Sequence, residues 1–544
     1  MRILKRIAAI ATVVAMLTAC GAKETPPQTE EEPVGTEAVS IELSDEGIKV
    51  EGSEVTDNTE AAVYVAHDIV YYEEGKDFTY GEGDETDAHS AEEAADHTVV
   101  HITQPGTYSV SGTLSKGQIA VDLGKDAEED PNAVVTLVLN GVDITCTVAP
   151  AVIFYNVYEC GSDDAETATK DVDTSAAGAN VIIADGTTNT VTGSHVARIY
   201  KPDSVELNED GTEVLDAKKL HKYDAAFYSK KSMNVNGGAQ GSGVLDIVAD
   251  NEGLDSELHL TINGGNINIV SGNDGINTNE DGVSVTTVNG GNLNILVTGE
   301  TGEGDGIDSN GWLVINGGTV TAVACGFSMD SGIDSDMGIH INGGSVVATG
   351  NMLDRIEAGG QNYAVFNFAG QQNGGELQLK NLDGEVVFSV GSVSNPYSIL
   401  IVSAPELVAG DYPFWNNEVQ LAGSAGGGMM GGPGMGGMMP QMPGGFDPSQ
   451  MPEMPEGGGF PGDFDFSQIP GGMTMPEGFD PSQMPGGMAG AEGFDPTQMP
   501  EGGRGPGGMG GGFPGRENGM GGEQSAVFSI ADGGSTFNNV APMN

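Results

Sequence analysis

The fold is decided by one recurring segment, which reads Gly306-Ile307-Asp308-Ser309-Asn310-Gly311-Trp312-Leu313-Val314-Ile315-Asn316-Gly317-Gly318. Its closing Asn-Gly-Gly triplet recurs in a regular series of five copies, at steps of 26 or 27 residues, which begin at Asn236, Asn263, Asn289, Asn316 and Asn342. Its opening Gly-Ile-Asp-Ser motif recurs, strictly or in degenerate form, at 227–229, 253–256, 275–278 and 332–335. Self-similarity at a period of this length indicates stacked repeats.

Within each repeat, apolar and polar residues alternate with period two. Leu258, Leu260 and Ile262 alternate with polar neighbours, and Ile267 and Ile269 do the same after the glycines. This alternation predicts half-buried strands, and no run has the spacing of an amphipathic helix. One repeat cannot bury its own apolar face, so the repeats must stack. We therefore expect an all-β parallel solenoid with rungs about 4.8 Å apart, along which the triplet asparagines form an amide ladder.

Composition divides the chain into six parts. We expect a lipoprotein signal peptide (1–20), a solvated tether (21–40), an N-terminal β cap (41–130), the solenoid (131–421), a low-complexity segment (422–524) and a final strand with a tail (525–544). The cap is expected because an uncovered sheet edge promotes association with other chains.

Charge and glycine content exclude several classes of protein. The chain has 79 Asp or Glu against 20 Lys or Arg, a formal net charge of −59. Phosphate binding needs Lys and Arg, so we exclude nucleic acid as a partner, and electrostatic docking on anionic lipid as well. The 86 glycines argue against a helix-rich enzyme, because each interior glycine costs a helix about 1 kcal/mol relative to alanine.

The first twenty residues predict export. Three basic residues within positions 2–6 precede an apolar run from Ile7 to Leu17, and Thr-Ala-Cys follows at 18–20. A basic start, a short apolar run and a small-residue cleavage site are typical of a secretory signal. The end of this segment resembles a bacterial lipobox, which implies that Cys20 is lipidated and holds the protein on the cell membrane, facing the extracellular side. The alternative is a plain secretion signal with an incidental cysteine.

The remaining cysteines give no metal or redox motif. Cys146 and Cys160 could form a disulfide in an exported protein, which would leave Cys325 unpaired. No Cys-x-x-Cys pair is present, so neither a zinc ribbon nor a thiol redox site is supported.

Residues 422–524 differ in character from the rest. They hold 15 of the 22 methionines, many glycines and prolines, and four copies of a motif that begins at Phe446, Phe464, Phe479 and Phe494. Such a composition buries too little apolar surface to offset chain entropy, so we expect disorder. The segment is either a flexible spacer, a set of thioether ligands for Cu(I) or a partner-binding region.

The acidic residues of the repeats fall into columns. Residues 232–354 include 16 Asp or Glu and no Lys or Arg. Stacking at rung spacing makes the carboxylates repel by about 1 kcal/mol or more, and Ca²⁺ takes six to eight oxygen ligands, so we expect calcium here. The expected ligands are Glu252, Asp255, Glu257, Asp274, Asn277, Asp305, Asp308, Asp330, Asp334 and Asp336. The alternative is that these acids are merely solvated and keep the chain soluble.

The motifs together resemble a family of exported bacterial proteins. The segments Gly106–Leu114 and Leu139–Ile144, with the Asp-Gly-Ile copies at Asp274 and Asp305, are similar to right-handed parallel β-helix carbohydrate-binding domains of cellulolytic clostridia. These domains resemble calcium-dependent pectate lyases in fold. The resemblance covers about 41–410 and 525–540, and it implies surface calcium ions and binding of cellulose or acidic pectin-type polysaccharide. The acidic turns of the family match Asp255, Asp274, Asp305, Asp308 and Asp334, whereas Tyr228 replaces the acid in the first copy.

Three functions remain open. The first is a lipid-anchored, calcium-dependent, non-catalytic polysaccharide-binding protein, which we expect to be a monomer. The second is a β-helix polysaccharide lyase or hydrolase, although the acidic stretch offers no Lys or Arg as a base. The third is a surface adhesin with a protein ligand. Candidate residues for stacking on or bonding to a sugar are Tyr228, His259 and Trp312.

Overall fold

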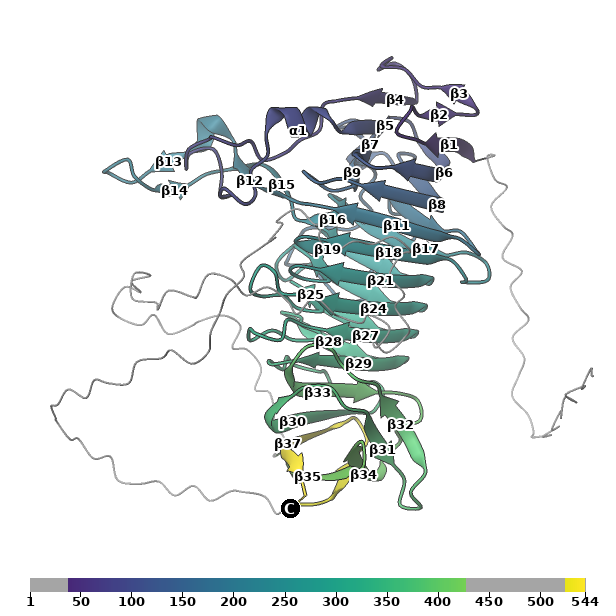
Figure 1. Ribbon diagram of the computed structural model, residues 1–544, viewed down its shortest axis with the longest axis vertical. Helices are drawn as coiled ribbons and strands as arrows, with labels where there is room; N and C mark the ends of the chain where they lie inside the picture. Colours follow the sequence, from purple (N-terminus) through teal and green to yellow (C-terminus); the bar gives the residue numbers. More distant parts are fainter. Residues whose placement is uncertain (1–37, 427–523, 544) are drawn as a thin grey trace, which may run out of the picture. The chain divides into compact units, whose positions relative to one another are not determined.

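The computed structural model describes residues 38–426 and 524–543. The predicted signal peptide, Cys20, nearly all of the tether and most of the low-complexity segment lie outside the described residues. The described part is all-β (Figure 1). Its helical structure is limited to α1 (Ala91–Ala95), which Ser90 caps, and two short 3-10 turns, η1 (Ala127–Glu129) and η2 (Pro202–Ser204). Among these residues, no helix is both long and apolar enough to cross a membrane.

Three stacks of parallel strands contain the repeats. Each of the first four repeats adds one strand to every stack, and the last adds a strand to the first and second stacks and an isolated bridge, Ile307 to Ile333, to the third. The first stack runs through β6 (Gly106–Leu114), β8 (Val135–Thr145), β10 (Ala179–Ile183), β17 (Met233–Gly237), β20 (His259–Ile262), β23 (Val285–Val288), β26 (Trp312–Ile315) and β28 (Gly338–Ile341). The second runs from β8 through β11 (Thr188–Gly193), β18 (Val244–Ala249), β21 (Asn266–Ser271), β24 (Asn292–Val297), β27 (Thr319–Val323) and β29 (Ser345–Gly350) (Figure 1). The third runs through β5 (Thr98–Ile102), β7 (Gly117–Asp122), β9 (Val152–Asn156), β16 (Ala225–Ser229), β19 (Glu252–Ser256), β22 (Ile276–Thr278) and β25 (Ile307–Ser309).

Both sequence motifs have a steric reason. The second glycine of the triplet adopts a left-handed backbone, with φ of +85° at Gly291, where a side chain would be strained. In the Gly-Ile-Asp-Ser motif, a Cβ on Gly275 would lie 2.1 Å from a methyl of Ile295 and 2.6 Å from the carbonyl oxygen of Gly306 in the next repeat. The following apolar residues, such as Ile276, fill the core. The glycine of the motif is therefore required by the close approach of the backbones of neighbouring repeats.

The predicted amide ladder is present on the first stack. The side-chain amide of Asn263 donates to Asn236 at 2.9 Å, and the same bond repeats from Asn289, Asn316 and Asn342 at 2.8–2.9 Å. Amides in register bond to one another because each has both a donor and an acceptor. All three cysteines of the described part are free thiols, so the possible Cys146–Cys160 disulfide is absent.

The N-terminal residues extend the stacks rather than only covering them. Parallel pairing begins at β1 (Val39–Leu43), which pairs with β6, and at β5, which pairs with β7, all before residue 131 where the solenoid was expected to start. These strands already lie in register with the strands that follow them in the stacks. The outer edge is covered by β1 (Val39–Leu43), β2 (Lys49–Val50), β3 (Ser53–Glu54) and β4 (Val63–Ala66). A side extension is formed by β12 (Val196–Tyr200), β13 (Glu206–Leu207), β14 (Val214–Asp216) and β15 (Lys219–Tyr223).

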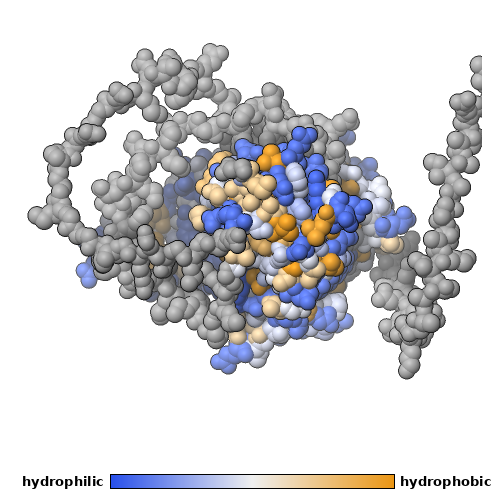
Figure 2. Space-filling model, turned by 90° about the horizontal axis from the view of Figure 1, so that it is seen from below, coloured by the Kyte–Doolittle hydropathy of each residue, from blue (hydrophilic) through white to orange (hydrophobic). Residues whose placement is uncertain are grey.

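The three parallel stacks end by Gly350, well before the expected limit of 421, because the strand that pairs with β29 on its far side runs antiparallel to it. The strands that follow pair mainly antiparallel, although β30 (Tyr363–Gln372) and β37 (Ser535–Pro542) pair parallel. The closing strands are β30 (Tyr363–Gln372), β31 (Leu377–Lys380), β32 (Val386–Val390), β33 (Tyr397–Ser403), β34 (Gly410–Asn416), β35 (Val419–Ala425), β36 (Val527–Ile530) and β37 (Ser535–Pro542). They have their own core of packed phenylalanines, including Phe366, Phe414 and Phe528. Viewed from this end, hydrophobic residues are interspersed among hydrophilic ones (Figure 2).

Substitution of Gly275 tests the close approach between repeats. Gly275→Ala places a methyl against backbone and core atoms that have no room to move, so we expect the free energy of unfolding to fall by about 1–3 kcal/mol in chemical denaturation. Gly370→Ala is the matched control, because no atom lies within 4 Å of its Cβ position. Equal stability of the two variants would contradict this packing.

Candidate metal centre on the third strand stack

The third stack aligns oxygen-bearing side chains because its strands pair in strict register. Asp255 is the partner of Asn277, which is in turn the partner of Asp308, and the preceding apolar residues point into the core. An isolated bridge from Ile307 to Ile333 brings Asp334 into the same column. This is the column that the spacing of the motifs predicts. Two groups of three carboxylates form along it.

The buried triad consists of Asp224, Glu252 and Asp255, with one oxygen of each within 4.8 Å of the other two. Asp255 is completely buried and Glu252 is 5% exposed. Lys222 places its ammonium 2.5 Å from Asp224. Burial, followed by the charges of neighbouring acids, raises the pKa of both Glu252 and Asp255 well above the usual range.

Some oxygens in and beside this triad are buried without a hydrogen-bond partner. Asn279 donates to both carboxylate oxygens of Asp255 at 2.9 and 3.0 Å, and Asn277 donates to one oxygen of Glu252 at 3.2 Å. The second oxygen of Glu252 and the side-chain oxygen of Asn277 are buried with no hydrogen-bond partner. A buried oxygen without a partner is costly, and hard cations such as Ca²⁺ take carboxylate and amide oxygens. The residues present therefore fit a divalent cation.

The outer triad consists of Asp305, Asp308 and Asp334, again within 4.8 Å of one another, and all three are half-buried. At this spacing each ionised pair repels by about 3 kcal/mol for an effective dielectric constant of about 20. Burial and then the charge of Asp274 raise the pKa of Asp305 to about 9. Burial and the charges of Asp336 and Asp354 raise the pKa of Asp308 to about 6 and of Asp334 to about 7. One oxygen of Asp334 is buried without a partner.

Five of the ten predicted ligands lie outside the triads: Asn277, described above, and Asp274, Glu257, Asp330 and Asp336. Asp274 lies between the two triads and accepts the backbone N–H of Asp305 at 2.6 Å. Glu257 is paired with Lys219 at 3.0 Å and accepts the hydroxyl of Tyr228. Asp330 accepts the backbone N–H of Gly304 at 2.6 Å, and Asp336 is exposed. Both oxygens of Glu257 accept from Lys219, and one oxygen of Asp330 accepts from Gly304 and Ser328, so for these two residues the role of metal ligand stays a prediction.

Two of the three predicted sugar-contacting residues are buried, which corrects that prediction. The ring of Tyr228 packs against Tyr223 of β15, with ring centres 5.4 Å apart. His259 is covered by the chain at Gly161, and its Nδ1 accepts the backbone N–H of Val285 at 3.1 Å. Burial lowers the pKa of His259 to about 4. Trp312 alone of the three keeps partial exposure.

Sequence reasoning missed Asp224, Lys222 and Asp354. Asp224 lies just before the degenerate first motif copy, in which Tyr228 takes the place of the acid, so the copy seemed to lack a ligand. Asp354 follows the last copy and accepts the backbone N–H of Ser335 at 3.1 Å. The available signal was an Asp at each end of the column, one before the first complete copy and one after the last.

Comparison with known proteins gives the family. Proteins described as carbohydrate-binding domain-containing match residues 96–381, just over half of the chain, and this region includes both triads. The chain belongs to this family. A carbohydrate-binding domain-containing protein of Acetivibrio thermocellus is 29% identical over 171 residues, which span 31% of this chain and 44% of that relative. Carbohydrate is therefore the class of ligand that the family supports.

A solved structure also shows some likeness to this member of the carbohydrate-binding family. It is the gadolinium derivative of a polysaccharide lyase-like protein from C. thermocellum, with 20% identity and a TM-score of 0.31. The match covers 57% of this chain and 90% of that one.

Metal-free protein should lose stability as pH rises. An unfolded Asp titrates near pH 3.9, whereas the folded outer triad titrates between about 6 and about 9. Between these values the folded state binds more protons than the unfolded state, so the free energy of unfolding falls from about pH 4 to about pH 9. Thermal melts of metal-stripped protein across this range measure the effect. Asp308→Asn should make the decline shallower, and a Tm that rises with pH would contradict it.

Proposed function

We propose that this carbohydrate-binding protein is a surface-anchored, calcium-dependent and non-catalytic receptor for polysaccharide. The observation that carries the proposal is the outer triad, in which three half-buried carboxylates converge and with which no Lys or Arg of the described residues forms an ion pair. Calcium bound there would supply the positive charge to bridge these carboxylates to oxygens of a glycan. Acidic pectin-type chains and cellulose are the candidate ligands.

The proposal includes a right-handed parallel β-helix as the scaffold. Parallel pairing in three stacks, with about one repeat per turn, supports this architecture. In such a scaffold the loops and strand ends of consecutive turns present the same side chain at every rung. A glycan lying along the stack then meets repeated contacts.

The two triads differ in solvent exposure, and we therefore propose different roles for them. The buried triad is closed to solvent and already has Lys222 beside Asp224, so a cation there would join the first complete repeat to the strand before it. The outer triad is half-exposed, so its oxygens can be shared with a ligand. We assign a structural role to the first and a ligand-facing role to the second.

The cationic side chains nearest the column support binding without turnover. A lyase needs a neutral base beside the metal, whereas Lys222 is held by Asp224. Although burial lowers the pKa of Lys222, the charge and hydrogen bond of Asp224 outweigh it, and the pKa is raised overall. Arg355 is engaged by Glu357 at 2.6 Å and by the carbonyl of Met337 at 2.9 Å. Lys222 is therefore protonated, and both side chains are committed to another contact.

Asp308→Asn tests the outer triad, because we expect the substitution to weaken binding when calcium is present and to raise the melting temperature when calcium is absent. With calcium, the variant should hold one ion fewer by elemental analysis and lose most of its retention on polygalacturonate. Without calcium, it should melt at a higher temperature than the unmodified chain, because one repulsive charge is removed. Asp383→Asn, at an exposed turn, is the control and should change neither property. Unchanged ion content and glycan retention in Asp308→Asn would contradict the proposed site.

The proposed attachment to the membrane depends on lipidation of Cys20 at the lipobox-like end of the predicted signal peptide, and it is tested separately. Cys20→Ala should move the protein from the detergent phase to the aqueous phase in a phase-separation assay of expressing bacteria, because acyl chains supply the membrane affinity. Glycan binding by the released protein should be unchanged. A variant that stays in the detergent phase would contradict lipidation at this residue.

A further inference from the structure

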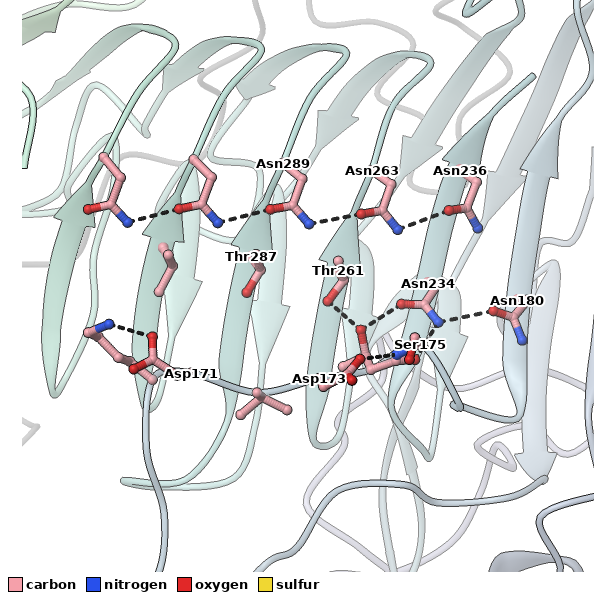
Figure 3. A pocket seen from close by; sticks show the side chains of 16 residues that line it. Asp171, Asp173, Ser175, Asn180, Asn234, Asn236, Thr261, Asn263, Thr287 and Asn289 are labelled. Carbon is pink, nitrogen blue, oxygen red and sulfur yellow. Dashed lines mark hydrogen bonds and ion pairs between the residues drawn. The ribbon is translucent and has the colours of Figure 1, made fainter. Parts of the chain in front are cut away.

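A polar groove runs along the first stack, on a different stack from the two triads. It has a volume of about 700 Å³ and is bounded by the amide ladder on one side and by a strap, residues 170–175, on the other. Figure 3 shows the ladder and the strap running side by side across successive strands. The ladder has five asparagines and four steps of about 4.8 Å, so it is roughly 19 Å long.

The strap is fixed to the floor of the groove at one end. The Thr174 hydroxyl donates to the side-chain oxygen of Asn234 at 2.7 Å and lies 2.7 Å from the hydroxyl of Thr261. Asn234 returns a bond to the carbonyl of Thr174 at 2.7 Å and donates to Asn180 at 3.0 Å. These three anchoring residues, Thr174, Asn234 and Thr261, are at most 7% exposed. The wall of the groove is therefore held in place by hydrogen bonds within the protein and does not depend on a bound ligand.

The ladder keeps free hydrogen-bonding capacity on its exposed side. A primary amide has two N–H donors and an oxygen with two lone pairs. The ladder bonds use one donor and one lone pair of Asn289 and of Asn316. One donor and one acceptor per rung therefore face the groove, and Asn263, Asn289, Asn316 and Asn342 are all exposed. Alternating donors and acceptors at regular spacing match a polymer that carries hydroxyl groups at regular intervals.

Charge selects a neutral polymer over an acidic one. The lining contains Lys170, but its ammonium is 2.5 Å from Asp171, and Asp173 adds a further negative charge. The chain as a whole carries −59. A polyanion would meet repulsion with no free cation to offset it, whereas hydroxyl groups meet none.

We infer that the groove between the amide ladder and the strap binds an extended neutral glycan chain lying along the stack, independently of calcium. The inference rests on the proposed function in taking polysaccharide as the ligand class. It adds a second site with its own specificity: uncharged sugars on the first stack and calcium-bridged sugars on the third.

The test uses cellohexaose and metal-stripped full-length chain in isothermal titration calorimetry. Asn289→Ala with Asn316→Ala removes two free amides from the groove and should weaken binding roughly tenfold or more. Asn292→Ala is the matched control: Asn292 is equally exposed and its amide also donates to the preceding repeat, to Asn266 at 2.7 Å, but it does not line the groove. Thr287→Trp fills the floor without removing a ladder bond and should also abolish binding.

The outcomes separate this inference from the proposed function. Cellohexaose binding by the metal-stripped chain and by Asn292→Ala, but not by the groove variants, supports the inference, provided that the variants melt at the temperature of the control. Equal affinity in the groove variants overturns it, as does glycan binding that appears only with calcium; in both cases calcium-dependent binding on the third stack stands. Absence of binding to cellohexaose and polygalacturonate with calcium present overturns the proposed function as well.

Discussion

Strict register between repeats is the constraint on which the rest of the structure depends. Because a residue in one strand lies directly beside its counterpart in the next, each type of side chain meets its own kind one rung away. For amides this is favourable, and Asn263, Asn289 and Asn316 bond in a chain. For carboxylates it is unfavourable, and the pKa of Asp305 rises to about 9 through burial and the charge of Asp274. The same geometry therefore stabilises one face and places a demand for cations or protons on another.

The fold tolerates the acidic column because other parts of the same repeats supply stability. Apolar residues next to the acids, such as Ile276 and Ile307, are completely buried and fix which side chains face outward. The glycines before them permit the close approach between repeats. Repulsion along the column is a local cost within a scaffold that is held together by its core and its backbone ladders. A column of this kind can be kept for function without loss of the fold.

The sequence predicts what repeats and little of what does not. Period and alternation were enough to predict an all-β chain, the inward positions, the column containing Asp255, Asn277 and Asp308, and the amide ladder. They were not enough where a non-repeating segment packs on a repeat. His259 occupies an outward position but is buried under the chain at Gly161, and the strap over Thr261 has no counterpart in the motif. Asp224 was missed for the same reason, since it precedes the periodic part.

The two polar faces are suited to different ligands because their groups differ in charge. Amides are neutral, keep a fixed pattern of donors and acceptors at any ordinary pH, and need no ion to face a sugar hydroxyl. Ionised carboxylates have no donor to offer. They can accept from sugar hydroxyls, but they can meet the carboxylates of an acidic glycan only through a shared cation or a shared proton. To bind an acidic glycan, a chain with a formal charge of −59 needs a shared cation. To bind a neutral glycan, amides alone are enough. Strict register allows one scaffold to carry both the amide ladder and the acidic column, because the same type of residue recurs at the same position in successive repeats.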